Sequence, residues 1–417
     1  MATNALSRTL VTLALAGAVA AAAVAPASAA PRSTSRSSPH PADAARSAHS
    51  ATQGALDAIT RAGTPGVLAR VDRAGETWRG TSGVADLRTG RPRLPQDRFR
   101  IGSLTKPFIA TVLLQLAAEP GHGLSTDDTV DKWLPGLVRG HGNDGRRITL
   151  RQLLQHTSGL YDYIDDDGLR ARFTGKAFLA HRYDSATPEE LVRIGLAHEP
   201  LFEPGKGWSY SNTNYILAGM VIEKATGHSY ASEVERRVIR PLGLHGTTVP
   251  GSSPSVPGPH GRHYSKLYVD DPAARSYDVT DFNPSFSGAS GEMISTARDL
   301  NVFVRALVRG KLLPPAQQKE MFTGHDLGGG RSYGLGIRSQ TLAACGVQVW
   351  GHSSEITGSL TRPAATADGE HVVTVNRNSD WGDPALEQAA LEAEFCRRPD
   401  QRPWERLTSG RAGPPAR

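Results

Sequence analysis

The sequence predicts an α/β (α+β) fold in which a sheet lobe is split by a mainly helical lobe. Strand-like runs lie towards both ends of the chain, at Val67–Asp72 and Glu370–Asn376. Between them, apolar residues recur mainly at helical spacing, and capping residues or glycines mark the ends of these segments. We therefore expect one domain at about 53–397, with the sheet lobe at about 53–102 and 285–397 and the helical lobe at about 103–284.

The first predicted elements are a hairpin and a long helix. Glu76–Gly80 is the expected hairpin partner of the strand Val67–Asp72. Ser103–Glu119 has an apolar stripe at helical spacing, and Pro107 falls in its first turn, where a missing amide hydrogen costs little. Ser103 is thus expected near a helix N-terminus, where the helix dipole and free amides favour developing negative charge.

The remaining elements follow the same two periodicities. Capping residues and closing glycines, of which Gly227 is the clearest, delimit the central helices. A further strand and a closing alanine-rich helix are expected towards the C-terminal end. The predicted helices are Thr149–Gln155, Pro188–Ala197, Ser211–Thr226, Tyr230–Val238, Ala297–Val308 and Pro384–Cys396, and the further strand is Val347–Trp350.

The two ends of the chain are expected to lie outside the folded domain. Arg8 precedes a short, alanine-rich apolar run, Leu10–Ala25, and small residues follow at Ala27 and Ala29. This pattern is typical of a secretory signal peptide at 1–29, cut before Ala30, and it makes a membrane anchor the weaker interpretation. We expect a secreted protein with no membrane span, a disordered leader at 30–52 and a flexible tail at 398–417.

Composition excludes some classes of protein and leaves one question open. The net charge is +6 and the pI is 9.4, but the arginines are scattered without interleaved aromatic residues, so a nucleic-acid partner is not expected. The chain has 2 cysteines, Cys345 and Cys396. In an exported protein they can form one disulfide, or they can remain two buried thiols. They cannot by themselves build a metal site.

Three short motifs occur in a fixed order: Ser103-Leu104-Thr105-Lys106, Tyr210-Ser211-Asn212 and His352-Ser353-Ser354. A serine three residues before a lysine places a nucleophile and a base on one face of a helical turn. The later motifs add a phenol, an amide and an imidazole. If the three motifs meet in space, they predict an acyl-transferring serine hydrolase.

Other motifs favour ordinary structural roles. Gly330-Arg331-Ser332-Tyr333-Gly334 has the spacing of a nucleophile elbow, with Asp368 and His371 following in order, but it lacks the preceding strand and following helix. His260 to His263 lacks the acidic partner and helix of a zinc protease motif. His156 is expected to pack or to form hydrogen bonds rather than to catalyse.

These motifs and their flanking segments resemble the serine penicillin-recognising hydrolases. Secreted D-alanyl-D-alanine carboxypeptidases are the most similar, and class C β-lactamases and related esterases are more distant. The likeness runs from about Leu56 to Cys396, and it implies a β-lactamase/transpeptidase-like fold with an antiparallel sheet flanked by helices. It is carried by Phe99–Lys106, Leu154–Tyr163, Tyr210–Tyr215, Gly291–Thr296 and Tyr333–Arg338.

The resemblance implies a role for each site residue. Ser103 would form the acyl-enzyme with Lys106 as its base, and Tyr210 would relay protons to the leaving amine. Asn212 would hold the substrate amide and Lys106, and His352 would replace the lysine of the usual Lys-Thr-Gly strand motif. Arg338 and Ser353 would bind a terminal carboxylate, and the backbone amides of Ser103 and Glu355 would form the oxyanion hole. The resemblance also implies a Cys345–Cys396 disulfide. Phe286, Trp208 and Tyr161 are candidates for pocket walls, with core packing as the favoured alternative.

The expected function is hydrolysis of D-Ala-D-Ala in peptidoglycan stem peptides, in the extracellular cell-wall space, with β-lactams as inhibitors. No cofactor and no metal is expected, and the protein is expected to be a monomer. Ser354 departs from the family pattern, which has glycine there, and a side chain at this position narrows the cleft or weakens turnover. The segment Ser359–Pro363 also lacks an expected aromatic residue. A β-lactamase, an esterase or a weakly catalytic penicillin-binding module therefore remain alternatives.

Overall fold

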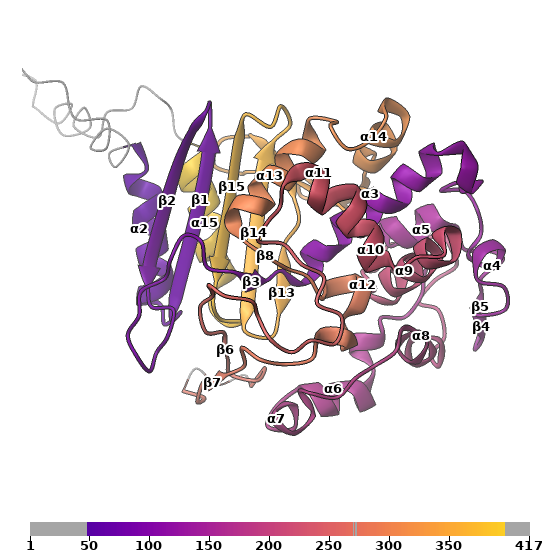
Figure 1. Cartoon of the computed structure of the whole chain (residues 1–417), viewed down its shortest axis with the longest axis horizontal. Coiled ribbons are helices and arrows are strands. Elements are labelled where there is room, and N and C mark those ends of the chain that lie inside the picture. The colour runs from indigo at the N-terminus through magenta and orange to yellow at the C-terminus, as the bar shows by residue number, and fades with distance from the viewer. Residues whose placement is uncertain (1–47, 270, 272, 397–417) are drawn as a thin grey trace, which may run out of the picture. The chain divides into compact units, whose positions relative to one another are not determined.

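The computed structural model describes residues 48–269, 271 and 273–396. The predicted signal peptide, the leader up to residue 47 and the predicted tail lie outside these residues. Within them, the centre is a 9-stranded antiparallel sheet with the order β2-β1-β15-β14-β12-β11-β10-β9, and β13 pairs with β14 (Figure 1). Its strands are β1 Gly66–Arg73, β2 Glu76–Gly83, β9 His325–Gly328, β10 Arg331–Tyr333, β11 Arg338–Thr341, β12 Gln348–Gly351, β13 Ser354–Ile356, β14 Ser359–Thr366 and β15 His371–Arg377.

Both ends of the described chain contribute to this sheet. β1 pairs along its whole length with β2 on one side and with β15 on the other, so that Ala69 lies between Gly80 and Val375. Every residue of β15 is buried, as expected for a strand covered on both faces. This arrangement confirms the predicted fold class.

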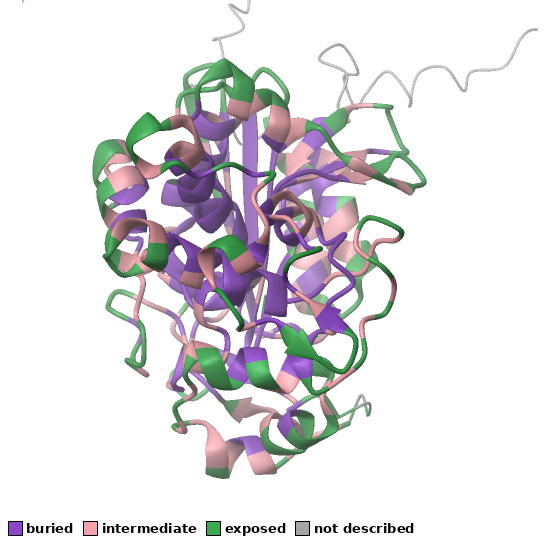
Figure 2. Cartoon of the chain, turned by 90° about the vertical axis from the view of Figure 1, so that its right-hand side faces the viewer, coloured by how far each residue is buried: buried purple, intermediate pink, exposed green. Residues whose placement is uncertain are grey.

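Helices cover both faces of the sheet. α2 (Ser50–Arg61) packs against β1 and β2, and α15 (Pro384–Phe395) packs against β15. The two helices also pack against one another, around Leu56, Ile59 and Leu391. α13 (Ala297–Val308) packs on β1, β14 and β15 from the other side. Figure 2 shows buried residues continuing through the sheet into the central helices, with exposed residues on the outer turns.

The segment between β3 and β8 is mainly helical. Its buried centre is α3 (Thr105–Ala118), which packs against α9 (Thr213–Thr226) and α12 (Gly288–Gly291). The other helices are α4 Val130–Trp133, α5 Leu150–Gln155, α6 Asp167–Phe173, α7 Ala177–His181, α8 Pro188–Leu196, α10 Tyr230–Val234 and α11 Arg240–Leu242, and α14 Pro315–Phe322 follows α13. Short strand pairs join β3 Phe99–Arg100 to β8 Ile294–Ser295, β4 Arg139–Gly140 to β5 Asn143–Asp144, and β6 Tyr264–Ser265 to β7 Tyr277–Asp278.

Several boundaries differ from the sequence-based expectations. The predicted leader, 30–52, ends too late, because α2 begins at Ser50 and the buried Thr52 donates a hydrogen bond to Glu394 at 2.6 Å. The predicted helix Tyr230–Val238 changes after Val234 into a π-helical turn, Glu235–Ile239. α9 begins at Thr213 rather than Ser211 and has Asn212 as its N-cap residue.

β14 is not among the strands predicted from the sequence, and it contains Pro363, a residue that is unusual in a central strand. In the structure, β14 pairs with β13 through Ser359–Thr361 and with β12 through Ala364–Thr366. Pro363 lies at the change of partner, so its missing amide hydrogen costs no ladder bond there.

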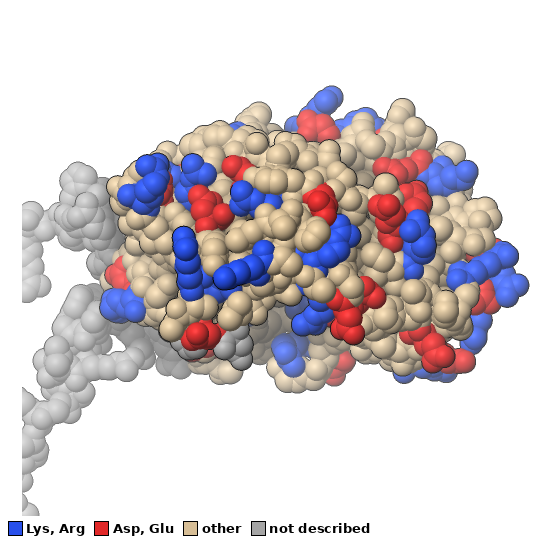
Figure 3. Space-filling view, turned by 90° about the horizontal axis from the view of Figure 1, so that it is seen from below, with Lys and Arg blue, Asp and Glu red and all other residues tan. Residues whose placement is uncertain are grey.

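Cys345 and Cys396 form a disulfide, as the resemblance implied, and it closes a segment of 51 residues. It joins the turn before β12 to the end of α15. On the face shown in Figure 3, Lys and Arg side chains are interspersed with Asp and Glu.

Candidate active site

Ser103 lies in the 3₁₀ turn Gly102–Leu104 that leads directly into α3. Gly102 allows this turn to approach β13 closely. Its φ is +44°, and a Cβ atom there would lie 2.5 Å from Ser354 Oγ and 2.8 Å from the Glu355 carbonyl oxygen. The sequence thus brings the nucleophile turn against the start of β13 by omitting a side chain.

Lys106 follows Ser103 by one turn and is fully buried. Its Nζ lies 3.2 Å from Ser103 Oγ, and it donates to Asn212 Oδ1 at 2.7 Å and to the Ser290 carbonyl oxygen at 2.8 Å. A neutral amine keeps two hydrogens, which suit the two carbonyl-type acceptors, Asn212 Oδ1 and Ser290 O. Its lone pair then faces Ser103 Oγ, which is the geometry that a general base needs.

Burial lowers the pKa of Lys106 well below its usual value, and the positive charge of Arg338 lowers it further. The negative charge of Asp162 acts in the opposite direction. Burial therefore favours the neutral amine that can take a proton from Ser103.

Tyr210 donates its phenolic hydrogen to Ser103 Oγ at 2.8 Å. Burial raises the pKa of Tyr210 well above its usual value, so the phenol stays protonated and acts as a donor to Ser103. Lys106, with a lowered pKa, is then the base of the pair, and Tyr210 is placed to supply a proton to a group bonded to Ser103.

Asn212 connects Lys106 to a residue that the sequence did not single out. Its Oδ1 accepts from Lys106, and its Nδ2 donates to Asp162 Oδ2 at 2.9 Å. Asp162 and the Ser290 carbonyl were missed in the motif search. A backbone acceptor has no sequence signature, and Asp162 stood only as part of the segment Leu154–Tyr163.

His352 is buried close to Tyr210 but forms no hydrogen bond with Ser103, Lys106 or Tyr210. The Tyr333 hydroxyl lies 3.0 Å from its Nε2, and the Ser353 carbonyl oxygen lies 2.6 Å from its Nδ1. Burial lowers the pKa of His352 well below its usual value. The structure therefore places His352 as a neutral, hydrogen-bonded neighbour of the site, although the resemblance implied that it replaces a lysine.

His156, predicted to pack or to form hydrogen bonds, does both. It is buried, its Nδ1 accepts from the Ser211 amide at 3.2 Å, and its Nε2 lies 3.0 Å from the Tyr333 hydroxyl. Tyr333 thus joins His156 to His352, and it belongs to the residues that the motif search did not identify as functional.

A cleft of about 240 Å³ opens above the nucleophile. Arg338, the first residue of β11, lies at this cleft, and its Nη1 donates to Ser353 Oγ at 3.2 Å. Neither Arg338 nor Glu355 forms an ion pair with another residue of the described chain. This nucleophile cleft is lined by Ser103, Tyr210, Arg338, Ser353, Ser354, Glu355, Leu360, Thr361 and Glu387.

A second, mainly apolar groove of about 310 Å³ shares Glu355 with the nucleophile cleft. Phe286 lines it and stacks on Phe173 at 4.6 Å, which agrees with a pocket-wall position. Trp208 instead packs edge-on against His156, and Tyr161 stacks on His198 at 3.9 Å. Trp208 and Tyr161 line neither of these two cavities.

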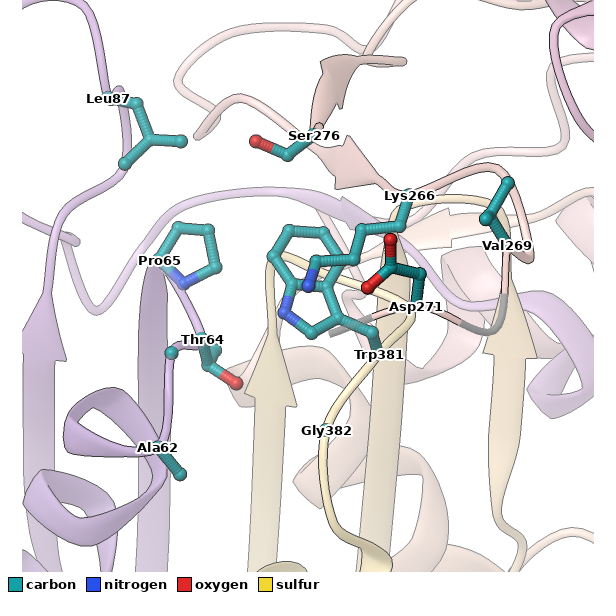
Figure 4. Close-up of a pocket in the computed structure, with 11 residues that line it drawn as sticks. Ala62, Thr64, Pro65, Leu87, Lys266, Val269, Asp271, Ser276, Trp381 and Gly382 are labelled. Carbon is teal, nitrogen blue, oxygen red and sulfur yellow. The ribbon is translucent and has the colours of Figure 1, made fainter. Parts of the chain in front are cut away.

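Size alone does not locate the site. A larger cavity of about 770 Å³ is lined by Lys266, Trp381, Thr64 and Leu87, among others, and it contains none of the motif residues (Figure 4). In it the Lys266 ammonium lies 5.5 Å from the Trp381 ring centroid. The serine of the elbow-like motif, Ser332, lies in a strand hairpin between β10 and β11 and not on a strand-to-helix turn.

The described residues contain no group of three or more His, Cys, Asp or Glu side chains arranged to hold a metal ion. In the same part of the chain, no helix is long and apolar enough to cross a membrane.

A Ser–Lys–Tyr centre with a buried lysine, placed between an antiparallel sheet and a helical segment, defines a serine hydrolase. The chain belongs to the Beta-lactamase family, whose model matches residues 45–394. It is similar to Penicillin-binding protein 4* of Bacillus subtilis (strain 168), with 31% identity over 75% of this chain and 67% of that protein.

Two solved structures share the fold over nearly their whole length. A D-stereospecific amidohydrolase from Streptomyces sp. has 49% identity and a TM-score of 0.78, covering 84% of this chain and 98% of that one. The D-amino acid amidase from Ochrobactrum anthropi SV3, complexed with L-phenylalanine amide, has 29% identity and a TM-score of 0.70, covering 83% and 97%.

Proposed function

We propose that this protein is a secreted serine-type D-Ala-D-Ala carboxypeptidase that acts on peptidoglycan stem peptides through an acyl-enzyme on Ser103. The observation that carries the proposal is the guanidinium of Arg338, which lies at the nucleophile cleft without a carboxylate partner among the described residues. An arginine in that position suits the terminal carboxylate of a leaving D-alanine. The similarity to a penicillin-binding protein supports the same substrate class and acylation by β-lactams.

The proposed reaction uses the contacts of Ser103 in sequence. Lys106 takes the Ser103 hydroxyl proton as Oγ forms a bond to the substrate carbonyl carbon. The backbone amides of Ser103 and Glu355 hold the oxygen that becomes negative. The C–N bond then breaks, Tyr210 protonates the leaving amine, and the proton on Lys106 returns to Tyr210, which restores the neutral amine and the phenol. Water then attacks the acyl carbon as Lys106 takes a proton from it, the bond between this carbon and Ser103 Oγ breaks, and Tyr210 protonates Oγ; the proton on Lys106 then returns to Tyr210 and the acid product leaves.

A second candidate is hydrolysis of D-amino acid amides, in which the acyl donor carries a free α-amino group. Glu355 favours it, because this exposed carboxylate forms no ion pair in the described chain and lies where the nucleophile cleft meets the apolar groove. An ammonium could pair with Glu355 while an apolar side chain enters the groove beside Phe286. Two structurally similar proteins are named as D-stereospecific amide hydrolases.

One set of substrates separates the candidates. Purified protein is assayed with diacetyl-L-Lys-D-Ala-D-Ala, the same peptide ending in an amide, and D- and L-phenylalanine amide, each beside Ser103→Ala. A carboxypeptidase releases D-alanine only from the peptide with a free carboxylate, and Arg338→Gln raises its KM by about 10- to 100-fold. Arg262→Gln, on a distant loop, is the matched control. Faster turnover of D-phenylalanine amide than of either peptide, lost in Glu355→Gln, would replace the first candidate by the second.

Secretion is part of this proposal. Expression of the full chain with its native N-terminus is expected to yield extracellular protein that begins at Ala30. Recovery of the protein inside the cells with residues 1–29 intact would contradict it.

A further inference from the structure

The carboxylate of Asp162 is connected to Lys106, a direct contact of Ser103, through the amide of Asn212. It is 8% exposed, and it accepts hydrogen bonds from Asn212 Nδ2 at 2.9 Å and from the Ile164 amide at 3.2 Å. Both partners are N–H donors, so each carboxylate oxygen must act as a hydrogen-bond acceptor. The surroundings are therefore built for an ionised carboxylate.

This contact fixes the orientation of Asn212. An amide can be turned so that its oxygen and nitrogen exchange places, and only the hydrogen-bond partners decide between the two arrangements. Asp162 requires the NH₂ group of Asn212, which leaves Oδ1 for the Lys106 ammonium or amine. With Oδ1 and the Ser290 carbonyl both occupied by Lys106 hydrogens, the Lys106 lone pair has one direction left, towards Ser103 Oγ.

We propose that Asp162 is a positioning residue that orients Asn212 and, through this amide, sets the protonation of Lys106 and so the nucleophilicity of Ser103. The inference rests on the proposed role of Ser103 as the nucleophile, and it holds for either candidate substrate. Asp162, Asn212 and Lys106 then act together as one buried row of hydrogen-bonded side chains. No single sequence motif includes all three residues.

The charge of Asp162 opposes the effect of burial on Lys106. Burial raises the pKa of Asp162, its N–H donors and Lys106 act in the opposite direction, and the ionised carboxylate favours the ammonium form of Lys106. Other titratable or charged groups face this pair. Asp165 and Tyr163 lie on the same segment as Asp162, and Tyr210 and Arg338 face Lys106 from the loop before α9 and from β11. Asp162 is joined to Lys106 through a shared hydrogen-bond partner, Asn212, whereas Tyr210 is joined to Lys106 through Ser103 Oγ.

The test measures the reactivity of Ser103 without reference to the natural substrate. A fluorophosphonate is used to label Ser103 in the full-length protein, and the rate of labelling is followed by mass spectrometry between pH 4 and 10. The acidic limb of this profile reports deprotonation of Lys106. In Asp162→Asn the limb is expected to move to lower pH by about one unit, because an opposite charge that stabilises the ammonium is removed.

Asp166→Asn is the matched control. Asp166 also caps a helix, accepting from the Leu169 amide at 2.9 Å, but it makes no contact with Asn212 or Lys106. Its profile is expected to keep the wild-type midpoint. A limb that stays at the same pH in Asp162→Asn, with labelling slowed equally at every pH, would overturn the proposal.

Two further outcomes are distinguishable. If wild-type Ser103 is not labelled at any pH, the nucleophile assignment fails and not the role of Asp162 within it. If circular dichroism shows that Asp162→Asn is unfolded, Asp162→Ser is used, since it also removes the charge and leaves room for water. Failure of both variants to fold would show that Asp162 is structural and would overturn the proposal.

Discussion

The Tyr333 hydroxyl and His352 Nε2 lie 3.0 Å apart, and the direction of this hydrogen bond is fixed from both ends. His352 Nδ1 faces the Ser353 carbonyl oxygen, which can only accept, so Nδ1 carries the hydrogen and Nε2 accepts from Tyr333. At the other end, His156 Nδ1 accepts a backbone hydrogen, so its Nε2 donates to Tyr333. Each imidazole is thus neutral and held in a single tautomer, with the hydrogen on Nδ1 in His352 and on Nε2 in His156.

This arrangement predicts that neither the acidic nor the basic limb of the pH dependence of kcat/KM reports titration of His352. His352→Gln is expected to slow acylation, since it disturbs the wall beside Tyr210, while the midpoints of the limbs stay in place. The reason is that the pKa of buried His352 lies well below its usual value, so the ring does not titrate near neutrality. The measurement is the pH dependence of kcat/KM. Loss or displacement of a limb in His352→Gln would show that His352 exchanges protons during catalysis.

Tyr210→Phe is expected to slow acylation of Ser103 by about 10²- to 10⁴-fold, the range for loss of a positioned proton donor. The phenol donates to Ser103 Oγ and, because burial raises its pKa, keeps its proton. The free energy of unfolding should change by no more than about 1 kcal/mol, because only one hydroxyl is lost. Single-turnover labelling and urea denaturation measure the two quantities. Tyr183→Phe, at a side chain that is 52% exposed, is the control, and an equal loss of rate there would contradict a specific role for Tyr210.

Gly102 and Ser354 are predicted to be energetically coupled. The Ser354 hydroxyl donates to the Ile101 carbonyl oxygen and occupies the space that a Cβ on Gly102 would need, 2.5 Å away. Gly102→Ala is expected to cost about 2–4 kcal/mol of unfolding free energy, from the positive φ and the close contact. Ser354→Gly should cost about 1 kcal/mol through the lost hydrogen bond.

In the double variant part of the cost of Gly102→Ala should be recovered, because the nearest contact is gone. The Glu355 carbonyl oxygen at 2.8 Å remains, so the recovery is incomplete. Urea denaturation of the four proteins completes the cycle. Additive costs would mean that the Ser354 side chain does not fill the space beside Gly102. The same geometry explains how the chain accommodates a serine where the resemblance implied a glycine, because the Ser354 hydroxyl donates to the Ile101 carbonyl oxygen, two residues before the nucleophile.

The parts of the site that the sequence could predict are the local ones. Ser103 and Lys106 share one helical turn, so their spacing already predicts that they meet. Tyr210 and Asn212 could be identified only by resemblance, because nothing in a separation of more than 100 residues says that two segments touch. Asp162, Tyr333 and the Ser290 carbonyl act only through tertiary contacts, and no local pattern distinguishes them from ordinary helix caps, core aromatics and backbone.

The fold shows the same division. Segments with a strong period, such as Ala297–Val308, were predicted with their observed bounds. β14 was not predicted, and whether a strand tolerates Pro363 depends on which strand lies opposite it, which the local sequence does not show. The start of α2 was misplaced because what orders Thr52 is a contact with Glu394, near the other end of the domain.

The last prediction concerns that contact and the stability of the protein in acid. Glu394, on α15, accepts from Thr52 at 2.6 Å and pairs with His49 at 2.9 Å and His371 at 3.1 Å. Burial alone would raise the pKa of Glu394, but the hydrogen bonds from His371, His49 and Thr52 outweigh it and lower the pKa to about 2, from 4.5. A carboxyl whose pKa is lower in the folded than in the unfolded state stabilises the fold above the unfolded pKa, and this contribution is lost as the pH falls from about 4.5 towards 2.

Glu394→Gln is therefore expected to reduce the free energy of unfolding at pH 7 by about 2–3 kcal/mol. The difference from wild type should shrink steadily below about pH 4.5, because the unfolded wild-type chain then binds a proton at Glu394 that the folded state does not bind until about pH 2. Urea denaturation at pH 7, 5, 4 and 3 measures this difference. Glu392→Gln, two residues away on the same helix, is the control and should show little effect at any pH. A difference between Glu394→Gln and wild type that stays constant from pH 7 to 3 would mean that shape, and not charge, makes Glu394 stabilising.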